Sequence, residues 1–401
     1  MNKKISSLLT AALLMLLLPG CWDRKEMNDL GIVLAMGIDQ GKNNMLSVSF
    51  QIVVPSEVAS NSGKSTTTPV TLYQTEAQTI LDAIHKMSLS SPRNGYISHI
   101  RVLVFSEAVA RTGIADKLEN MLRHPEMRPD FFVMIARHSK AADILNVLTP
   151  LETIPANNMF LSLQNSSTTW APTITTQSDE LLEKMINEGV EPVMTGIEII
   201  GNRSEGGSKD NLASIKPKAT LTYTGMGVLR KDKLLGWMNE QESKGYNYIT
   251  NNVQTTSGNL PCPDNKGRLS LLVLRSNTDI KVKVIAGKPV IHITLTNTSS
   301  ILGDGCTTPI SNQSDIKAIQ NSSEEKLIQL MRSSVTAAQR RYHSDIFGFG
   351  LAISREKPKL WAQLRDNWED EFTTLKVEYE AHSKLRRVGM LDDSILQDLK
   401  E

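Results

Sequence analysis

The 401-residue chain has few cysteines and no strong excess of charge of either sign. It contains only Cys21, Cys262 and Cys306, and its 44 basic side chains are balanced by 43 acidic ones. Binding to a nucleic acid would require lysine and arginine gathered on one face, whereas here the two signs are interspersed. A metal site would require closely spaced ligands, which no Cys or His pair supplies. We therefore expect no nucleic-acid partner, no metal and no cofactor.

Long apolar runs are also lacking. The first one, Leu8 to Leu18, has about half of the roughly 20 residues that span a bilayer, and Pro19 and Gly20 end it. Lys3 and Lys4 precede it, which favours a signal peptide over residues 1–20 rather than a membrane span. Its removal leaves 42 basic against 43 acidic side chains, a formal charge of −1.

Small Gly20 directly before Cys21 is the pattern at which a bacterial lipoprotein is cleaved and lipidated. We predict cleavage between Gly20 and Cys21, and lipid attachment at Cys21 as S-diacylglycerol with N-acylation, palmitate being a typical acyl group. Burial of acyl carbons is worth about 0.8 kcal/mol per methylene, so two chains anchor stably where one dissociates. The expected location is the outer face of the cytoplasmic membrane.

Catalytic motifs are absent from the sequence. No Gly-x-Ser-x-Gly elbow and no glycine-rich phosphate loop occurs, and the Asp392–Asp393 pair lies in a polar tail where burial could not separate two carboxyl pKa values. Lone histidines are usually satisfied surface or core residues. The seven here are scattered without a nucleophile motif: His85, His99, His124, His138, His292, His343 and His382. We expect no enzymatic activity.

Two cysteines remain beside the lipidation site. Cys262 lies in a turn-like Pro-Cys-Pro segment and Cys306 in a glycine-containing loop. Outside the cytoplasm such loop cysteines can meet in a disulfide. A disulfide and two separate thiols both remain open at this point.

Hydrophobic patterning predicts a mixed α/β, or α+β, chain of several domains. Strands and helices alternate over residues 21–150, which indicates an N-terminal mixed α/β domain. Residues 151–201 read as a small middle unit or connecting segment, and residues 202–214 as a polar linker. Residues 215–391 read as a C-terminal α+β domain, followed by a polar tail over 392–401.

Individual elements follow from periodicity and capping signals. Thr75 with Gln78 predicts a helix start, and Ser322 with Glu325 predicts a long helix covering the C-terminal sheet. That sheet is expected to be mostly antiparallel. Its predicted strands are 219–223, 227–235, 269–274, 280–285 and 290–295, with a closing strand over 375–381.

An ordered set of motifs spans nearly the whole chain, and with it the sequence resembles the Ger(x)C family of spore germination lipoproteins. The motifs are Gly20-Cys21-Trp22-Asp23-Arg24, Leu30-Gly31-Ile32-Val33, Gly37-Ile38-Asp39, Gly227-Val228-Leu229, Leu235-Gly236-Trp237 with Glu240 and Glu242, and Asp345-Ile346-Phe347-Gly348-Phe349-Gly350 followed by Trp361 and Trp368.

Each motif also has a plain structural interpretation. Phe347 to Gly350 suits a bend whose rings fill the core, and Trp361 with Trp368 suits a buried stripe. Trp22 suits either the membrane interface or a tether without contacts.

The resemblance implies three α/β domains and a non-enzymatic C subunit of a nutrient germinant receptor. Its implied partners are two integral-membrane proteins, the A and B subunits, in the spore inner membrane. The alternative is a lipoprotein that binds solutes for an envelope transport system. Such proteins usually have two similar hinged α/β lobes, which the antiparallel second half argues against.

Overall fold

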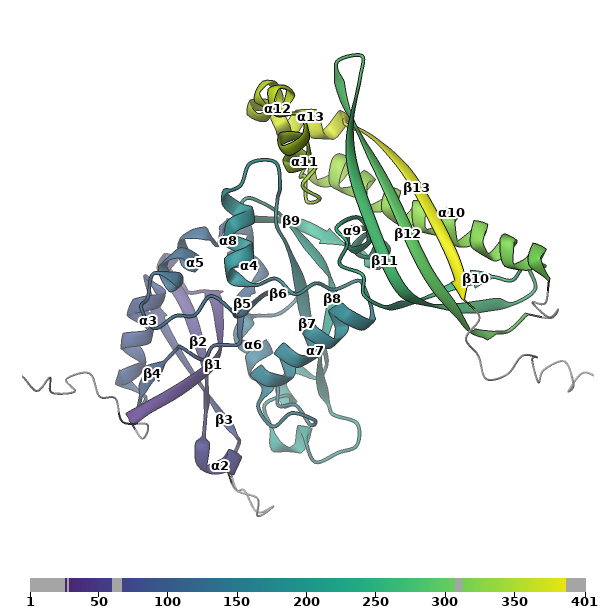
Figure 1. Ribbon diagram of the computed structural model, residues 1–401. Coiled ribbons are helices and arrows are strands. Elements are labelled where there is room, and N and C mark those ends of the chain that lie inside the picture. The colour runs from purple at the N-terminus through teal and green to yellow at the C-terminus, as the bar shows by residue number, and fades with distance from the viewer. Residues whose placement is uncertain (1–25, 27–28, 60–66, 307–311, 387–401) are drawn as a thin grey trace, which may run out of the picture.

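The computed structural model of the chain describes residues 26, 29–59, 67–306 and 312–386. In this part of the chain, the strands form a large mixed sheet and a smaller C-terminal sheet (Figure 1). The protein is therefore α+β, as the sequence predicts. The predicted signal peptide, with Gly20 and Cys21, and the predicted tail over 392–401 lie outside the described residues.

The large sheet has the strand order β3-β2-β1-β5-β6-β7-β8-β9, with β4 beside β1. Its centre is parallel, because β1, β5, β6 and β7 run in one direction, while β2, β3, β8 and β9 add antiparallel edges. The strands are β1 (Leu30–Gln40), β2 (Leu46–Val53), β3 (Val70–Ala77), β4 (Asn94–Tyr96), β5 (Val102–Ser106), β6 (Phe132–Ala136), β7 (Val193–Gly201), β8 (Ala219–Arg230) and β9 (Lys233–Met238).

Helices cover both faces of this sheet. Strands β5 and β6 are buried along their whole length, as expected of central parallel strands. One face packs against α3 (Ile80–Lys86), α4 (Glu107–Thr112), α5 (Ala115–Leu122) and α8 (Ser178–Ile186). The other packs against α6 (Ala141–Leu145) and α7 (Pro155–Thr169), while α2 (Pro55–Ala59) follows β2.

The smaller sheet has the order β10-β11-β12-β13. Its first three strands are antiparallel and β13 is parallel to β12. The long helix α10 lies along it (Figure 1), as the sequence predicts. The elements of this region are α9 (Glu240–Ile249), β10 (Thr256–Pro261), β11 (Arg268–Ile285), β12 (Lys288–Asp304), α10 (Gln313–Ala337), α11 (Phe349–Glu356), α12 (Pro358–Leu364), α13 (Trp368–Thr374) and β13 (Lys376–Arg386).

Two strands predicted for the C-terminal sheet belong to the large sheet instead. β8 pairs with β7 and β9 pairs with β8, so the first sheet continues past the expected division near residue 214. Alternation shows that a strand forms but not which strand it joins, because any half-buried strand has the same period.

The polar segment over 202–214 packs against the large sheet rather than spanning a gap. It forms two short 3₁₀ turns, Arg203–Glu205 and Lys209–Asn211. The Asn211 amide is fully buried, donates to the carbonyls of Leu148 and Ala219, and accepts from the Ala219 N–H. These bonds satisfy backbone groups that would otherwise be buried without partners, which composition alone does not predict.

Both predicted capping boxes are wrong about where the helix starts. Thr75 lies inside β3, and α3 begins after Thr79, whose hydroxyl accepts from the Asp82 N–H. Helix α10 begins after Asn312, which places Ser322 inside the helix. Short polar motifs of this kind recur by chance, and the helices are capped instead by the side chains of Thr79 and Asn312.

Candidate functional site

The motifs in the second half of the chain that carry the family resemblance lie at the junction between the two sheets. We call this region the junction: the segment Gly189–Glu191, the β8–β9 hairpin, the start of α9, and residues Ala338–Gly350 after α10. It begins with a π-helical turn over Ala338–Tyr342 at the end of α10. Single π-helical turns are frequently found at functional sites.

The buried carboxylate of Asp345 organises the loop before α11. Its oxygens accept the backbone N–H groups of residues 347–350 at 2.8 to 3.2 Å, and the indole N–H of Trp368 at 3.1 Å. Burial raises the pKa of Asp345 to about 6, although these donors favour the charged form and act in the opposite direction. The carboxylate thus holds the start of α11 against α13.

The aromatic residues of this loop are core residues, as the structural interpretation predicts. Phe347 and Phe349 stack with ring centroids 5.0 Å apart. Trp361 and Trp368 are each 8% exposed and meet edge to face at 5.2 Å. Gly348 has φ +75°, a left-handed conformation that glycine adopts without strain.

Side chains after α10 reach the β8–β9 hairpin and α9. The Tyr342 hydroxyl donates to the Trp237 carbonyl at 2.6 Å, and the Arg341 guanidinium pairs with Glu242 at 2.5 Å. A Cβ at Gly236 would lie 2.8 Å from the Tyr342 ring, so this glycine makes room for the tyrosine.

Glu242 has two roles in this contact. Its carboxylate also accepts from the Asn239 N–H at 3.0 Å, while the Asn239 side chain accepts from the Glu242 N–H at 2.9 Å. This reciprocal capping box starts α9. The same carboxylate therefore fixes the start of one helix and the end of another.

The junction continues at the β7 end of the large sheet. The N–H of Glu191 donates to the Asp345 carbonyl at 2.8 Å, and the hydroxyl of Ser344 donates to the Leu229 carbonyl at 2.7 Å. Burial raises the pKa of Glu191 to about 7, with the carboxylates of Glu369 and Asp345 acting in the same direction. The two sheets are thus joined by buried hydrogen bonds from several segments.

The N-terminal motif Gly37-Ile38-Asp39 has a comparable role within the large sheet. The buried Asp39 carboxylate accepts from the backbone N–H groups of Ala141 and Ala142 at 2.8 and 2.9 Å, and thereby caps α6. A Cβ at Gly37 would lie 3.1 Å from the Ala141 side chain, so the glycine permits this close packing.

The two remaining cysteines lie together in the structure. Cys262 and Cys306 are buried and joined as a disulfide, with Cα atoms 5.6 Å apart. Cys262 follows β10 and Cys306 follows β12, so the bond would tie both strand ends at one end of the smaller sheet. The predicted lipidation residue Cys21 and the cleavage residue Gly20 lie outside the described residues.

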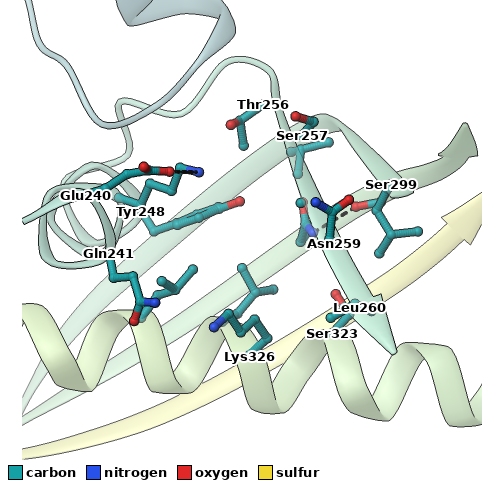
Figure 2. Close-up of a pocket in the computed structure, with 17 residues that line it drawn as sticks. Glu240, Gln241, Tyr248, Thr256, Ser257, Asn259, Leu260, Ser299, Ser323 and Lys326 are labelled. Carbon is teal, nitrogen blue, oxygen red and sulfur yellow. Dashed lines mark hydrogen bonds and ion pairs between the residues drawn. The ribbon is translucent and has the colours of Figure 1, made fainter. Parts of the chain in front are cut away.

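Sequence reasoning missed a cavity between α9, α10 and the smaller sheet, which is shown in Figure 2. A usable signal was present in β12. The inward-facing positions Ile291, Ile293 and Leu295 are followed at the same spacing by the buried polar residues Asn297 and Ser299. A switch from apolar to polar at inward positions points to a polar site within a core.

Within the described ranges of the chain, neither a membrane-spanning helix nor a metal-binding cluster is found. No helix there is long and apolar enough to cross a bilayer. No group of three or more His, Cys, Asp or Glu side chains in those ranges has a geometry that could hold a metal ion.

The fold and the junction define a two-sheet α+β protein, and the family models that match its chain are those of spore germination proteins. The family model described as "Spore germination protein N-terminal domain" matches residues 23–199, and the one described as "Spore germination B3/ GerAC like, C-terminal" matches residues 224–389. The chain belongs to the Ger(x)C family.

Relatives match over nearly the full length. Spore germination protein KC of Bacillus subtilis (strain 168) is 29% identical over 97% of this chain and 98% of its own. Spore germination protein B3 of the same organism is 24% identical over 94% of this chain and 96% of its own. The crystal structure of the GerBC protein has the same fold, with a TM-score of 0.53 and 20% identity over 87% of this chain and 96% of that one.

Proposed function

We propose that the protein is a lipid-anchored, non-enzymatic C subunit of a nutrient germinant receptor, required for spores to germinate in response to nutrients. The observation that carries this proposal is the full-length match to proteins named for spore germination. Its proposed partners are the integral-membrane A and B subunits, and its proposed location is the outer face of the spore inner membrane.

Lipid attachment at Cys21 would limit the orientation of the protein. Glu26 lies five positions after Cys21, and an extended chain spans at most about 3.6 Å per residue, so Glu26 would lie within about 18 Å of the lipidated residue. Glu26 lines a recess with His85, Tyr96 and His124. We propose that this end of the large sheet faces the membrane.

The anchor proposal is tested by nutrient-triggered germination of spores whose only C subunit carries Cys21→Ala. We expect the nutrient response to be lost while a non-nutrient trigger still works. A matched control adds an unrelated N-terminal transmembrane helix to the Cys21→Ala chain and should restore the response, because it replaces the tether without the lipid. A normal response from untethered Cys21→Ala would refute the proposal.

The orientation is tested with a fluorophore at Ser88→Cys, beside that recess, and another at Lys288→Cys in the β11–β12 hairpin. Figure 1 shows this hairpin at the opposite end of the molecule from β4. Quenchers carried by membrane lipids should quench the Ser88 label strongly and the Lys288 label little. Equal quenching, or the reverse order, would contradict the proposed orientation.

A further inference from the structure

The core beneath the smaller sheet is divided into two apolar clusters. One contains Val273, Leu327 and Leu330, and the other contains Leu260 and Leu271. Between them lies a cavity of about 190 Å³, lined by residues of both clusters and by α9 (Figure 2). Protein interiors normally leave few voids larger than a water molecule. An apolar cavity of roughly 150 Å³ is large enough to bind benzene, so this one can hold a small organic molecule.

Two side chains that line the cavity carry buried polar atoms without a partner. Thr256 and Asn297 are each 2% exposed, and within the described residues nothing hydrogen-bonds to the Thr256 Oγ1 atom or the Asn297 Oδ1 atom. The Asn297 amide is held in place because its Nδ2 group donates to the Ser299 hydroxyl at 2.9 Å. A buried polar atom left unpaired is costly, which makes these two atoms candidates for ligand contacts.

A third polar group comes from α9. Tyr248 is 4% exposed, and burial raises the pKa of its phenol, so the hydroxyl stays protonated and can donate. Figure 2 shows this hydroxyl directed toward the strand that carries Asn259. The inner polar groups of the cavity are therefore a phenol, a hydroxyl and an amide, all uncharged.

The charged residues of the cavity lining, Glu240, Lys244 and Lys326, are all more exposed than Tyr248, Thr256 and Asn297. The Lys244 ammonium is paired with Glu240 at 2.9 Å and lies 3.9 Å from the Trp170 ring centroid, and Lys326 is partly exposed on α10. A charged group placed beside those three buried polar groups would be desolvated away from the more exposed charges, at a high cost in free energy. The chemistry of the lining thus selects an uncharged ligand.

We propose that this cavity binds a small uncharged molecule with an apolar body and an amide or hydroxyl group. The polar group would hydrogen-bond to Asn297 and Thr256, and the body would contact the leucines of both clusters. This proposal goes beyond the proposed receptor role, and its test does not depend on that role.

The test is calorimetry on the full-length chain in detergent with isobutyramide as the probe. We expect a saturable heat with isobutyramide and none with isobutylammonium, which has the same branched body but carries a charge. Thr256→Val and Asn297→Leu should each weaken binding about tenfold, since each removes one hydrogen bond to the probe. Thr294→Val, on the outward side of the same strand β12, is the matched control and should leave binding unchanged.

Two further measurements keep the proposal falsifiable. Thr256→Val should raise the melting temperature of the ligand-free protein, because it removes an unpaired buried hydroxyl. Leu327→Phe should abolish binding by filling the cavity. The proposal is overturned if isobutyramide gives no saturable heat, if Thr256→Val or Leu327→Phe binds it as well as the unaltered chain, or if a crystal soaked with it holds only ordered water in the cavity.

Discussion

Gly189 and Gly350 pack directly against each other across the junction. A Cβ at Gly350 would lie 2.5 Å from the Gly189 Cα atom, and the Gly189 carbonyl accepts the Leu351 N–H at 3.2 Å. The segment before β7 and the start of α11 therefore approach at backbone distance, which only glycine at both positions allows.

We predict that Gly350→Ala destabilises the protein by about 1 to 3 kcal/mol, the usual cost of overpacking a core. The added methyl group would also meet the Trp361 and Trp368 rings at 2.8 and 2.9 Å. Urea unfolding measures the change. Gly303→Ala is the control, because a Cβ there meets nothing within 4 Å. Equal stability of the two variants would contradict the close approach.

Asp345→Asn should cost roughly 2 to 4 kcal/mol of unfolding free energy at pH 7. The substitution replaces one acceptor oxygen by an NH₂ group, which can only donate. That group would face the backbone N–H of Gly350 or the indole N–H of Trp368, so that buried donors are left without an acceptor. Asp366→Asn, at a side chain that is 90% exposed, is the matched control and should change stability by less than about 0.5 kcal/mol. The loss of tryptophan fluorescence with increasing urea concentration measures the unfolding of both variants.

Stability should fall as the pH rises from about 4.5 to about 7, in part through Glu191. Its pKa is raised from 4.5 to about 7 in the folded protein, so the folded state holds a proton over this range that the unfolded state has released. The contribution is fully present below pH 4.5 and lost above pH 7.

Glu191→Gln removes this titration and keeps an acceptor for the Lys231 N–H, so its melting temperature should decline less over the same range. Exposed Glu188→Gln should follow the unaltered chain. A Glu191→Gln profile parallel to that of the unaltered chain would show that Glu191 does not cause the pH dependence.

We predict that Cys262 and Cys306 are bonded in the isolated protein, and that reduction of the bond costs about 2 to 4 kcal/mol. The two cysteines are 44 residues apart in sequence, and a cross-link that closes such a loop restricts the unfolded chain. Melting curves with and without a reducing agent measure the loss. In the Cys262→Ala/Cys306→Ala double variant the reducing agent should have no effect, and an equal response there would rule out the bond as the cause.

The sequence predicted local structure better than long-range pairing. The apolar stripe of α10 was sufficient to predict a long helix on the smaller sheet, because burial on one face imposes a period. The assignment of β8 and β9 to the large sheet could not be read in this way, since the partner of a strand depends on where the rest of the chain lies.

The roles of the motif residues needed the structure for a similar reason. The sequence suggested that Phe347 and Phe349 fill a core, and they do. The hydrogen bond from Trp368 to Asp345 and the contact of Glu242 with Arg341 join residues 23 and 99 positions apart, and neither has a local signal. The cavity at Asn297 did have one, in the change from apolar to polar at inward positions of β12.

The pairing of β13 with β12 has a consequence for when the smaller sheet can be completed during synthesis. Because these strands are parallel, all residues between Asp304 and Lys376 must cross over before the last strand can dock. Until residue 386 has emerged, β12 presents an unpaired edge, which can pair with other chains. A polypeptide that ends before Lys376 would lack β13 entirely and would keep the β12 edge unpaired.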